Sequence, residues 1–574
     1  MSDSDSSSEK KDEAIAAVSP PAAVPVKTPM TAKDVKVSAG TMGMVSLAVF
    51  SSRLLGLVRE IVFNSLFGGP MRRWGDAFQT AFRVPNLLRD LFAEGALSTA
   101  FVTTFSKTLA TDGEEAAWRL ARKVTTMAAV FMTAISIAGV LFAPWIVETI
   151  SAGWVAKEPD KVGFAVLLAK IMYPFILLVS LAALAMGILN ARKIFGIPAL
   201  ASTFFNIFSI ISGTAFGWCF DHKFGKNALI GFAIGTLVGG AAQLFVQLPS
   251  LKRTGFRFYL DFQWSDPGVR KVLQLMGPSV ISGSVVQFNV FLNNYYASYV
   301  VTADGTSDGP QMWLNAAFRM VQLPLGIFGV VIGTVTLPAI SRLATEGITD
   351  AFKETLARSL KLVFLMTLPS AVGMALLSHE IIGIIYQHGV WNDTDTHMAA
   401  LAMETYAWGL ICFAGIKIVQ PAFYAIDRRY IPLVISVAAV LVSAICNYVT
   451  VYRLHWGHQY LALGTSASAF VNFGLLMWAM RTVAGGLRER ELMGNMAKLL
   501  LSSLAMAAVC WGAKATLLTN FSHQNLALKV ITLSVTIAVA AGVYFGVNAL
   551  LKNEEVEDIK GLVLRKFRRR SRPA

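Results

Sequence analysis

The first two long apolar stretches of this chain carry charged side chains where a membrane-spanning helix is normally uncharged. They are Arg53, Arg59 and Glu60 in residues 41–68, and Asp76, Arg83, Arg89, Asp90 and Glu94 in residues 76–109. An arginine at the centre of a bilayer costs at least about 2.5 kcal/mol, so it usually faces a bundle interior or a wet cavity. Guanidinium groups that face one cavity can hold an anion, and phosphate matches their planar donors.

Helical spacing places these charges on shared strips, because residues seven apart lie within about 20° of each other around an α-helix. The two strips contain Ser52, Arg53, Arg59 and Glu60 in the first stretch, and Asp76, Arg83, Asn86, Arg89, Asp90 and Glu94 in the second. In an alternative interpretation the acids pair with the arginines and only fix helix packing. That alternative stays open, above all for Asp90 and Glu94.

Two later stretches add polar candidates for the same cavity. Residues 277–296 carry Ser282, Ser284, Gln287, Asn289, Asn293 and Asn294. Such groups often tie membrane helices together, but we expect some of them, including Gln287, to line the cavity. Arg319 has no acid on its own stretch and therefore needs a counter-charge from another helix or from a ligand. Lys417 is a weaker candidate, because lysine can snorkel to the membrane surface.

The sequence lacks the signatures of the common enzyme and metal sites. It contains no Walker A, H-E-x-x-H or G-x-S-x-G pattern. The four cysteines, Cys219, Cys412, Cys446 and Cys510, have no metal-ligand spacing. His455 and His458 could form a metal pair, but we interpret them as residues of a solvated loop. We therefore expect a transporter rather than an enzyme, without a cofactor or a metal site.

Composition identifies the broad class of protein. Of the 574 residues, 55% are hydrophobic and only 15% are charged, whereas a soluble domain is closer to about 25% charged. The net charge of +15 could suggest nucleic acid. Membrane proteins, however, gather Lys and Arg on their cytoplasmic loops, and no nucleic-acid module is present. The chain is expected to be a multi-pass membrane protein that does not bind nucleic acid.

About fourteen apolar stretches are long enough to cross a bilayer core of roughly 30 Å, and stretches of this kind span lipid as helices. They lie near 41–68, 76–109, 115–149, 161–190, 196–219, 227–248, 268–302, 309–341, 350–377, 396–426, 430–452, 459–481, 493–517 and 525–551. The predicted fold class is an all-α polytopic membrane protein of about fourteen transmembrane helices. Basic residues concentrate in alternate loops and in the C-terminal tail, which places both termini in the cytoplasm.

Short sequence matches about 230 residues apart suggest an internal repeat. "GILNARKIFGIP" (187–198) is echoed by "AFYAIDRRYIP" (422–432), and "GFAIGT" (231–236) by "YLALGT" (460–465). Two halves around a central site is the usual plan of an alternating-access transporter. The predicted domains are a disordered cytoplasmic tail (1–38), an N-terminal lobe of helices 1–6 (39–250), a C-terminal lobe of helices 7–12 (251–482), helices 13–14 (483–552) and a basic cytoplasmic tail (553–574).

Several of these segments resemble the MurJ (MviN) family of lipid II flippases, within the multidrug/oligosaccharidyl-lipid/polysaccharide exporter superfamily. The segments are "SSRLLGLVREIVFNSLFG" (51–68), "DAFQTAFRVPNLLRDLFAEGALSTAFV" (76–102), "FRMVQLPLGIFGVVIGTVTLPAIS" (318–341) and "QPAFYAIDRRYIP" (420–432). The resemblance covers roughly residues 41–551. Two positions depart from the family pattern: Phe318 replaces a common aspartate and Gln322 a common glutamate, which leaves the acid that balances Arg319 undecided.

The resemblance implies two six-helix lobes, with two C-terminal helices forming a groove for a polyprenyl chain. It implies a bacterial inner-membrane flippase of peptidoglycan biosynthesis, which supports the cell wall and cell shape. The substrate would be the undecaprenyl-pyrophosphate-linked precursor, moved from the inner to the outer leaflet. The cavity arginines of the family match Arg53, Arg59, Arg89 and Arg319, and its acid on helix 2 matches Asp76. The partners would be lipid II and membrane lipids, with a coupling ion and cell-wall synthesis proteins left open.

Three other functions stay as alternatives. A multidrug antiporter would need an acidic, aromatic cavity, which the arginine excess disfavours. A scaffold for cell-wall enzymes would leave the intramembrane arginines without a purpose. An exporter of another polyprenyl-linked glycan is disfavoured only by the family-specific segments.

Overall fold

The computed structural model describes residues 39–557 except 303, 520 and 522–523, and this part of the chain is built from helices without strands. The predicted tail at 1–38 and most of the predicted tail at 553–574 lie outside the described residues. Twelve of the described helices are long and apolar enough to cross a membrane. The all-α membrane fold is therefore confirmed, whereas the count of fourteen spans stays a prediction.

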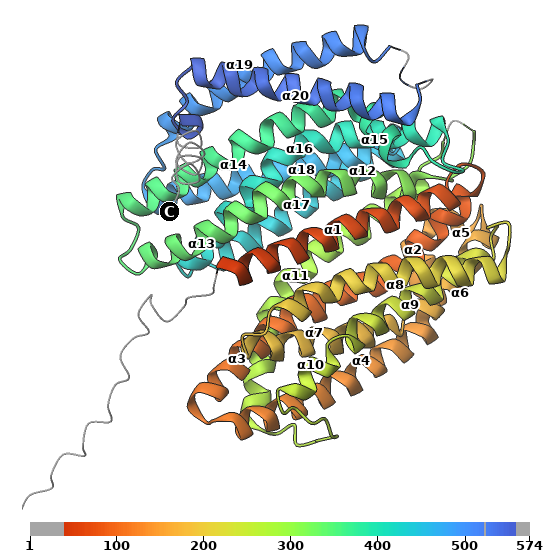
Figure 1. Ribbon diagram of the computed structural model, residues 1–574, viewed down its shortest axis with the longest axis vertical. Coiled ribbons are helices and arrows are strands. Elements are labelled where there is room, and N and C mark those ends of the chain that lie inside the picture. Colours follow the sequence, from red (N-terminus) through yellow and green to blue (C-terminus); the bar gives the residue numbers. More distant parts are fainter. Residues whose placement is uncertain (1–38, 303, 520, 522–523, 558–574) are drawn as a thin grey trace, which may run out of the picture.

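The first group of helices comes from the predicted N-terminal lobe (Figure 1). Its members are α1 (Ala39–Phe67), η1 (Gly69–Met71), α2 (Arg72–Leu88), η2 (Arg89–Leu97), α3 (Ser98–Thr111), α4 (Glu114–Ile150), α5 (Ala152–Val155), α6 (Pro159–Met172), α7 (Phe175–Ala191), α8 (Gly196–Phe220), α9 (Ala228–Phe245) and α10 (Leu248–Arg253). The charged helices α1 and α2 are not among the twelve apolar spans.

The second group comes from the predicted C-terminal lobe and the two helices that follow it. Its members are α11 (Pro267–Tyr299), α12 (Pro310–Pro324), η3 (Leu325–Val330), α13 (Val331–Ala344), α14 (Asp350–Leu376), α15 (Ser378–Tyr386), α16 (Asp393–Ala425), α17 (Tyr430–Tyr448), η4 (Val449–Arg453), α18 (Gln459–Ala484), α19 (Glu489–Thr516) and α20 (Leu526–Leu550). In Figure 1, α19 and α20 lie along the outer edge of this group, and α1 runs between the two groups. The predicted domain boundaries stay a prediction.

Local sequence explains where several of these helices begin. The Asp266 side chain caps α11 by accepting a hydrogen bond from the Gly268 amide, and Pro267 occupies the first helical position. Asn392 and Asp395 form a reciprocal capping box at the start of α16. These signals set the helix ends that carry the site described below.

Close helix packing in the first group depends on glycine. A Cβ atom on Gly235 would lie 2.5 Å from the backbone of Gly213, so α8 and α9 approach each other where neither residue has a side chain. Small residues that let backbones approach are the usual basis of helix association in lipid. Helix α1 packs against α8 in this closely packed pair.

Helices α2 and α12, which carry Arg83 and Arg319, share one irregularity. Both α2 and α12 contain a proline near their end, Pro85 and Pro324, and each continues directly into a π-helical turn, η2 or η3. Proline removes one backbone hydrogen bond, and π-helical turns occur mostly where function requires them.

Candidate functional site

An ion pair joins helix α1 to helix α12. Arg319 Nε on α12 lies 3.2 Å from Glu60 Oε2 on α1, and the two side chains are 32% and 15% exposed. Arg319 was predicted to need a counter-charge from another helix or a ligand. The structure identifies Glu60 as that counter-charge and resolves which acid balances Arg319.

Glycines make room for the arginines at this crossing. A Cβ atom on Gly56 of α1 would lie 2.7 Å from Nη2 of Arg319. In the reciprocal arrangement, the guanidinium of Arg53 on α1 occupies the space beside Gly326 of η3. Each helix therefore presents an arginine to a glycine of the other, which brings Arg53 and Arg319 onto the same α1–α12 seam.

Helix α8 contacts Arg59, the second arginine of α1 in this group. The Arg59 guanidinium lies over the ring of Phe205 at 5.0 Å, and Asn206 Nδ2 donates to the Ser52 carbonyl oxygen at 3.1 Å. Arg59 is also close enough to Arg319, Glu60 and Arg89 to interact with their charges. The predicted strip of α1 is therefore held between α8 and α12.

The strip on α2 and η2 contributes two further arginines. Arg83 donates to Asn315 Oδ1 of α12, while the Arg83 Nε atom is buried without a hydrogen-bond partner. Arg89 donates to Asp90 Oδ1 through Nε at 3.1 Å and Nη2 at 2.7 Å. The pairing of Arg89 with Asp90 follows the structural alternative of the sequence analysis. Asn86 lies half-buried one turn before Arg89.

The central group carries more positive than negative charge. With Asp76 left out because it lies elsewhere, the two strips and Arg319 together contribute five arginines against the three acids Glu60, Asp90 and Glu94. The five arginines are Arg53, Arg59, Arg83, Arg89 and Arg319. Several guanidinium groups around a site of reduced solvent exposure attract an anion that accepts two hydrogen bonds from each planar fork. A diphosphate fits this donor set.

Asp76 lies apart from the central arginines. It is fully buried and accepts hydrogen bonds from the amides of Gly309 (2.7 Å) and Met312 (2.9 Å) at the first turn of α12, and lies 3.4 Å from Lys161 Nζ. A carboxylate at a helix N-terminus is favoured by the amides and the helix dipole. Asp76 precedes Arg83 by seven residues, or about 10 Å along the helix. In this conformation it engages protein, so a contact with substrate stays a prediction.

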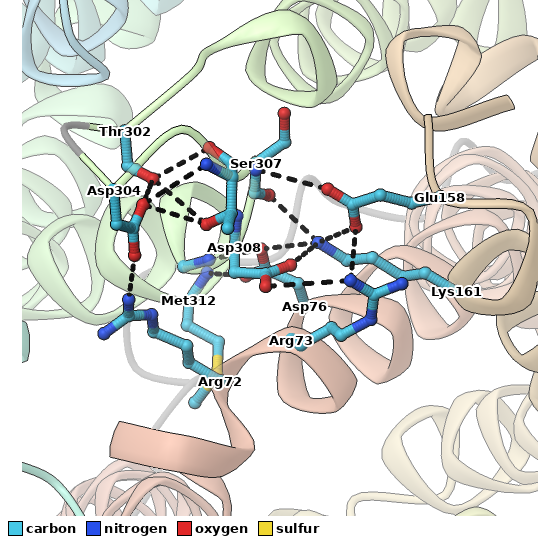
Figure 2. A network of polar contacts seen from close by, with 12 residues as sticks. Arg72, Arg73, Asp76, Glu158, Lys161, Thr302, Asp304, Ser307, Asp308 and Met312 are labelled. Atoms are coloured by element: carbon cyan, nitrogen blue, oxygen red, sulfur yellow. Dashed lines mark hydrogen bonds and ion pairs between the residues drawn. The ribbon is translucent and has the colours of Figure 1, made fainter. Parts of the chain in front are cut away.

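The surroundings of Asp76 form a polar network that joins both groups of helices (Figure 2). Lys161 Nζ is fully buried and lies 2.9 Å from Asp308 Oδ1, 2.9 Å from the Ser307 carbonyl oxygen and 3.4 Å from Glu158. Around it, Arg73 lies 3.6 Å from Glu158 and Arg72 lies 2.5 Å from Asp304. We call these residues, together with Asp76, Gly309 and Met312, the outer network, because they lie at the predicted outer end.

A second contact at the same end involves the start of α16. Asp395 is fully buried and accepts hydrogen bonds from the Gly69 amide at 2.5 Å and from Trp313 Nε1 at 2.9 Å. Beside it, the Val390 amide donates to the Ser65 carbonyl oxygen at 2.9 Å. The turn between α1 and α2 is therefore fixed to the second group of helices independently of Asp76.

The sequence analysis gave no role to Lys161, Asp395 or Trp313 and therefore missed both contacts. Lys161 stands at the first position of the predicted span 161–190, where a lysine is usually solvated, whereas in the structure it is 0% exposed. His458 was assigned to a solvated loop, and this was wrong: it is 2% exposed, and its Nε2 lies 2.8 Å from the Met398 carbonyl oxygen.

Among the polar residues of α11, Asn293 links neighbouring helices, whereas the role of Gln287 stays a prediction. Asn293 donates to Thr465 Oγ1 at 3.2 Å and accepts from Asn447 Nδ2 at 2.7 Å, which links α11 to α18 and α17. Interhelical bonds of this kind stabilise membrane bundles modestly. Gln287 is half-buried, and its place in the cavity stays a prediction.

Comparison with known proteins gives one consistent result. Residues 63–553 match the family model described as "Lipid II flippase MurJ". A "probable lipid II flippase MurJ" of Buchnera aphidicola subsp. Acyrthosiphon pisum is 32% identical over 75% of this chain and 81% of its own length. A solved structure of a lipid II flippase MurJ in an inward closed conformation is similar with a TM-score of 0.70 and 25% identity, over 87% of this chain and 98% of the other.

The wider fold is shared with a second kind of transporter. An inward-facing structure of a multidrug resistance MATE family transporter of the MOP superfamily has a TM-score of 0.63 at 14% identity, over 76% of this chain and 95% of the other. At this identity the likeness concerns the fold alone.

Proposed function

This chain belongs to the MurJ family of lipid II flippases, and we propose that it carries lipid II from the inner to the outer leaflet by alternating access. It is a transporter and not an enzyme. In the proposed mechanism the arginines of the α1–α12 seam hold the diphosphate of the head group. The polyprenyl chain stays in hydrocarbon, beside α19 and α20.

The physical problem of this transport is desolvation. A diphosphate with its sugar–peptide head cannot enter hydrocarbon unless other groups replace its hydration. Guanidinium groups replace it with short, charge-assisted and often bidentate hydrogen bonds. Arg53, Arg59, Arg89 and Arg319 carry this role in the proposal, with Arg83 and Asn86 beside them on the second strip.

One observation carries the proposal: arginines from α1 and α12, which belong to different groups of helices, lie along one seam, where Glu60 of α1 pairs with Arg319 of α12. Glu60 then acts as an internal stand-in for the substrate. While the site is empty, its carboxylate neutralises Arg319, and the arriving diphosphate takes its place. The change exchanges one anionic partner for another, so Arg319 is never left unpaired in a poorly solvated site.

The outer network supports a conformation that is closed at the predicted outer end. It joins α2 and the start of α6 to residues 304–312, with Lys161 and Asp76 fully buried. Alternating access requires these contacts to separate so that the head group can leave on the outer side. The contact of Asp395 with Gly69 must open with them.

The membrane potential favours this direction of transport. A potential that is negative inside drives an anion outward with about 2.3 kcal/mol per elementary charge per 100 mV. The rival substrate class, a cationic drug, would be repelled by the same arginines. Similarity to a MATE transporter concerns the fold and does not favour that class.

The decisive experiment measures the leaflet exposure of labelled lipid II in cells depleted of their own flippase. Alanine replacement of Arg53, Arg59, Arg89 or Arg319 should abolish transport and growth while the protein still inserts at normal levels. Growth of a strain in which all four are replaced would end the proposal. A drug-susceptibility assay on the same strains separates the multidrug alternative.

A further inference from the structure

The segment between α10 and α11 exposes an unusual concentration of large apolar side chains. Phe258 is 51% exposed, Tyr259 52%, Leu260 61% and Phe262 60%. We call residues 255–265 the interlobe segment, because it connects the last helix of the first group to the first helix of the second. Exposed contiguous apolar surface of this kind marks contact with a membrane or another molecule.

Basic residues surround the apolar side chains. The segment and its neighbours on α4 and α10 contribute Arg119, Arg122, Lys123, Lys252, Arg253 and Arg257. The Arg122 guanidinium lies over the Tyr259 ring at 4.2 Å. A cleft of about 600 Å³ opens between α4 and the segment, with Arg119, Lys123, Tyr259, Asp261 and Phe262 in its lining. Cationic and aromatic groups, together with one carboxylate, therefore face the same cleft.

Two polar contacts connect α4 to the interlobe segment and to Asp266 beside it. The Asp261 amide donates to Thr126 Oγ1 of α4 at 3.1 Å, and Lys123 Nζ lies 2.8 Å from Asp266 Oδ2. Burial alone would raise the pKa of the Asp266 carboxyl, but hydrogen bonds from Lys123 and the Gly268 amide outweigh it and lower that pKa. Asp266 is therefore charged and neutralises Lys123.

Unlike Lys123, which is paired with Asp266, Arg119 and Arg122 have hydrogen-bond donors available for an anion. Arg119 is exposed and has no ion pair in the part of the chain that the structure describes. The Arg122 Nε atom is buried without a hydrogen-bond partner, although a buried donor of this kind is normally satisfied. An anionic group in the cleft would accept from Arg119, which lines it, and from Arg122 once that side chain turns away from the Tyr259 ring beside the cleft.

The combination of features selects one class of ligand. Aromatic rings favour the membrane–water interface, where an apolar body and a polar edge are both accommodated. Lys and Arg at that surface attract acidic lipid head groups. The basic loops on this side are the predicted cytoplasmic ones. A water-soluble anion would use the arginines but would give the exposed Phe258, Leu260 and Phe262 no partner.

We propose that the cleft between α4 and the interlobe segment binds an acidic phospholipid of the inner leaflet. The phosphate is held by Arg119 and Arg122, and Phe258, Leu260 and Phe262 insert among the upper parts of the acyl chains. Because the segment is the covalent connection between the two groups of helices, the bound lipid fixes this connection at the membrane surface. The inference does not depend on the identity of the transported substrate.

The test uses the purified full-length chain and phosphatidylglycerol as the probe. Native mass spectrometry measures how much phosphatidylglycerol stays bound, with phosphatidylcholine of the same acyl chains as the neutral comparison. The double variant Arg119→Gln/Arg122→Gln should bind phosphatidylglycerol at least about tenfold more weakly, the factor that corresponds to about 1.4 kcal/mol. Arg429→Gln is the matched control, since Arg429 is an exposed arginine of another predicted cytoplasmic loop. It should leave binding unchanged.

Three results would overturn the proposal: equal binding of both lipids by the unmodified protein, equal loss in the control and double variants, or full displacement of phosphatidylglycerol by one equivalent of lipid II. The last would assign the cleft to the substrate. A photoactivatable phosphatidylglycerol gives an answer without mutation, should the double variant fold poorly. Its adducts are expected on residues 255–265 or on α4, and adducts confined to other segments contradict the site.

Discussion

Arg319 of α12 and Glu60 of α1 form an ion pair of 3.2 Å between two helices that are far apart in the sequence. The arginine is a third exposed, so solvent weakens the attraction relative to a fully buried pair. Such a pair can form and separate during a transport cycle at moderate cost. This property distinguishes it from the fully buried Lys161–Asp76 pair of the outer network.

The first prediction concerns Glu60→Gln. Removing the internal carboxylate frees Arg319 for the diphosphate, so the affinity for lipid II should rise by up to about tenfold, which corresponds to about 1.4 kcal/mol. Release should slow, and transport should fall. Binding to purified protein and leaflet exposure in cells measure the two effects. Unchanged or weaker binding by Glu60→Gln would show that the carboxylate is not a stand-in for substrate.

The second prediction concerns Gly326→Ala. A methyl group would occupy the space that the Arg53 guanidinium fills, so the arginine must move, and transport should drop severely. The guanidinium is the far end of a flexible side chain, so the free energy of unfolding should change by less than about 1 kcal/mol. Gly474→Ala on α18 is the matched control, since a Cβ there meets nothing within 4 Å. Normal transport by Gly326→Ala would mean that the position of Arg53 is unimportant.

The third prediction concerns the outer network. Lys161→Met leaves Asp76, Glu158 and Asp308 without their shared buried cation, and breaking a buried ion pair costs about 3–5 kcal/mol. The loss of stability in thermal unfolding should be partly reversed in Lys161→Met/Asp76→Asn, because the second change removes one of the uncompensated charges. Additive losses in the double variant would contradict the coupling.

The fourth prediction concerns pH. Burial lowers the pKa of His458 to about 4, although its bond to the Met398 carbonyl oxygen acts in the opposite direction. The unfolded chain, with a histidine pKa near about 6.5, binds more protons than the folded chain between these values. Stability should therefore rise by about 3 kcal/mol from pH 4 to pH 6.5 and then stay level. Unfolding scans across this range, compared with His458→Gln, measure the slope. A slope that persists in His458→Gln has another origin.

The arrangement of helices was largely predictable because its cause is local. Apolar length and loop charge predict a helix near 115–149, where α4 spans Glu114–Ile150, and near 525–551, where α20 spans Leu526–Leu550. Short helices such as α5 and α15 are too brief to give a signal of this kind. The π-helical turns η2 and η3 were not predicted either, because their hydrogen-bond pattern depends on tertiary packing as well as on Pro85 and Pro324.

The site was predictable in composition but not in pairing. The strips on α1 and α2 follow from helical spacing, and Arg319 was identified as an intramembrane charge. The pairing of Arg319 with Glu60, and the position of Asp76 in the outer network and not beside the arginines, depend on which helices become neighbours. No single-sequence pattern contains that information. The spacing of Asp76 and Arg83 places both on one face of α2 but says nothing about α12, whose first turn takes the carboxylate.

The first turn of α12 and Arg319 belong to one uninterrupted α-helix, which ends only at Pro324. Asp76 accepts hydrogen bonds from Gly309 and Met312 at the start of that helix, and Arg319 follows seven residues after Met312. The contact with Asp76 and the arginine proposed to bind the anion therefore lie on the same short helix. A movement of α12 away from Asp76 therefore also displaces Arg319. In the proposed mechanism, opening of the outer network and release of the diphosphate by Arg319 would therefore be one movement of α12.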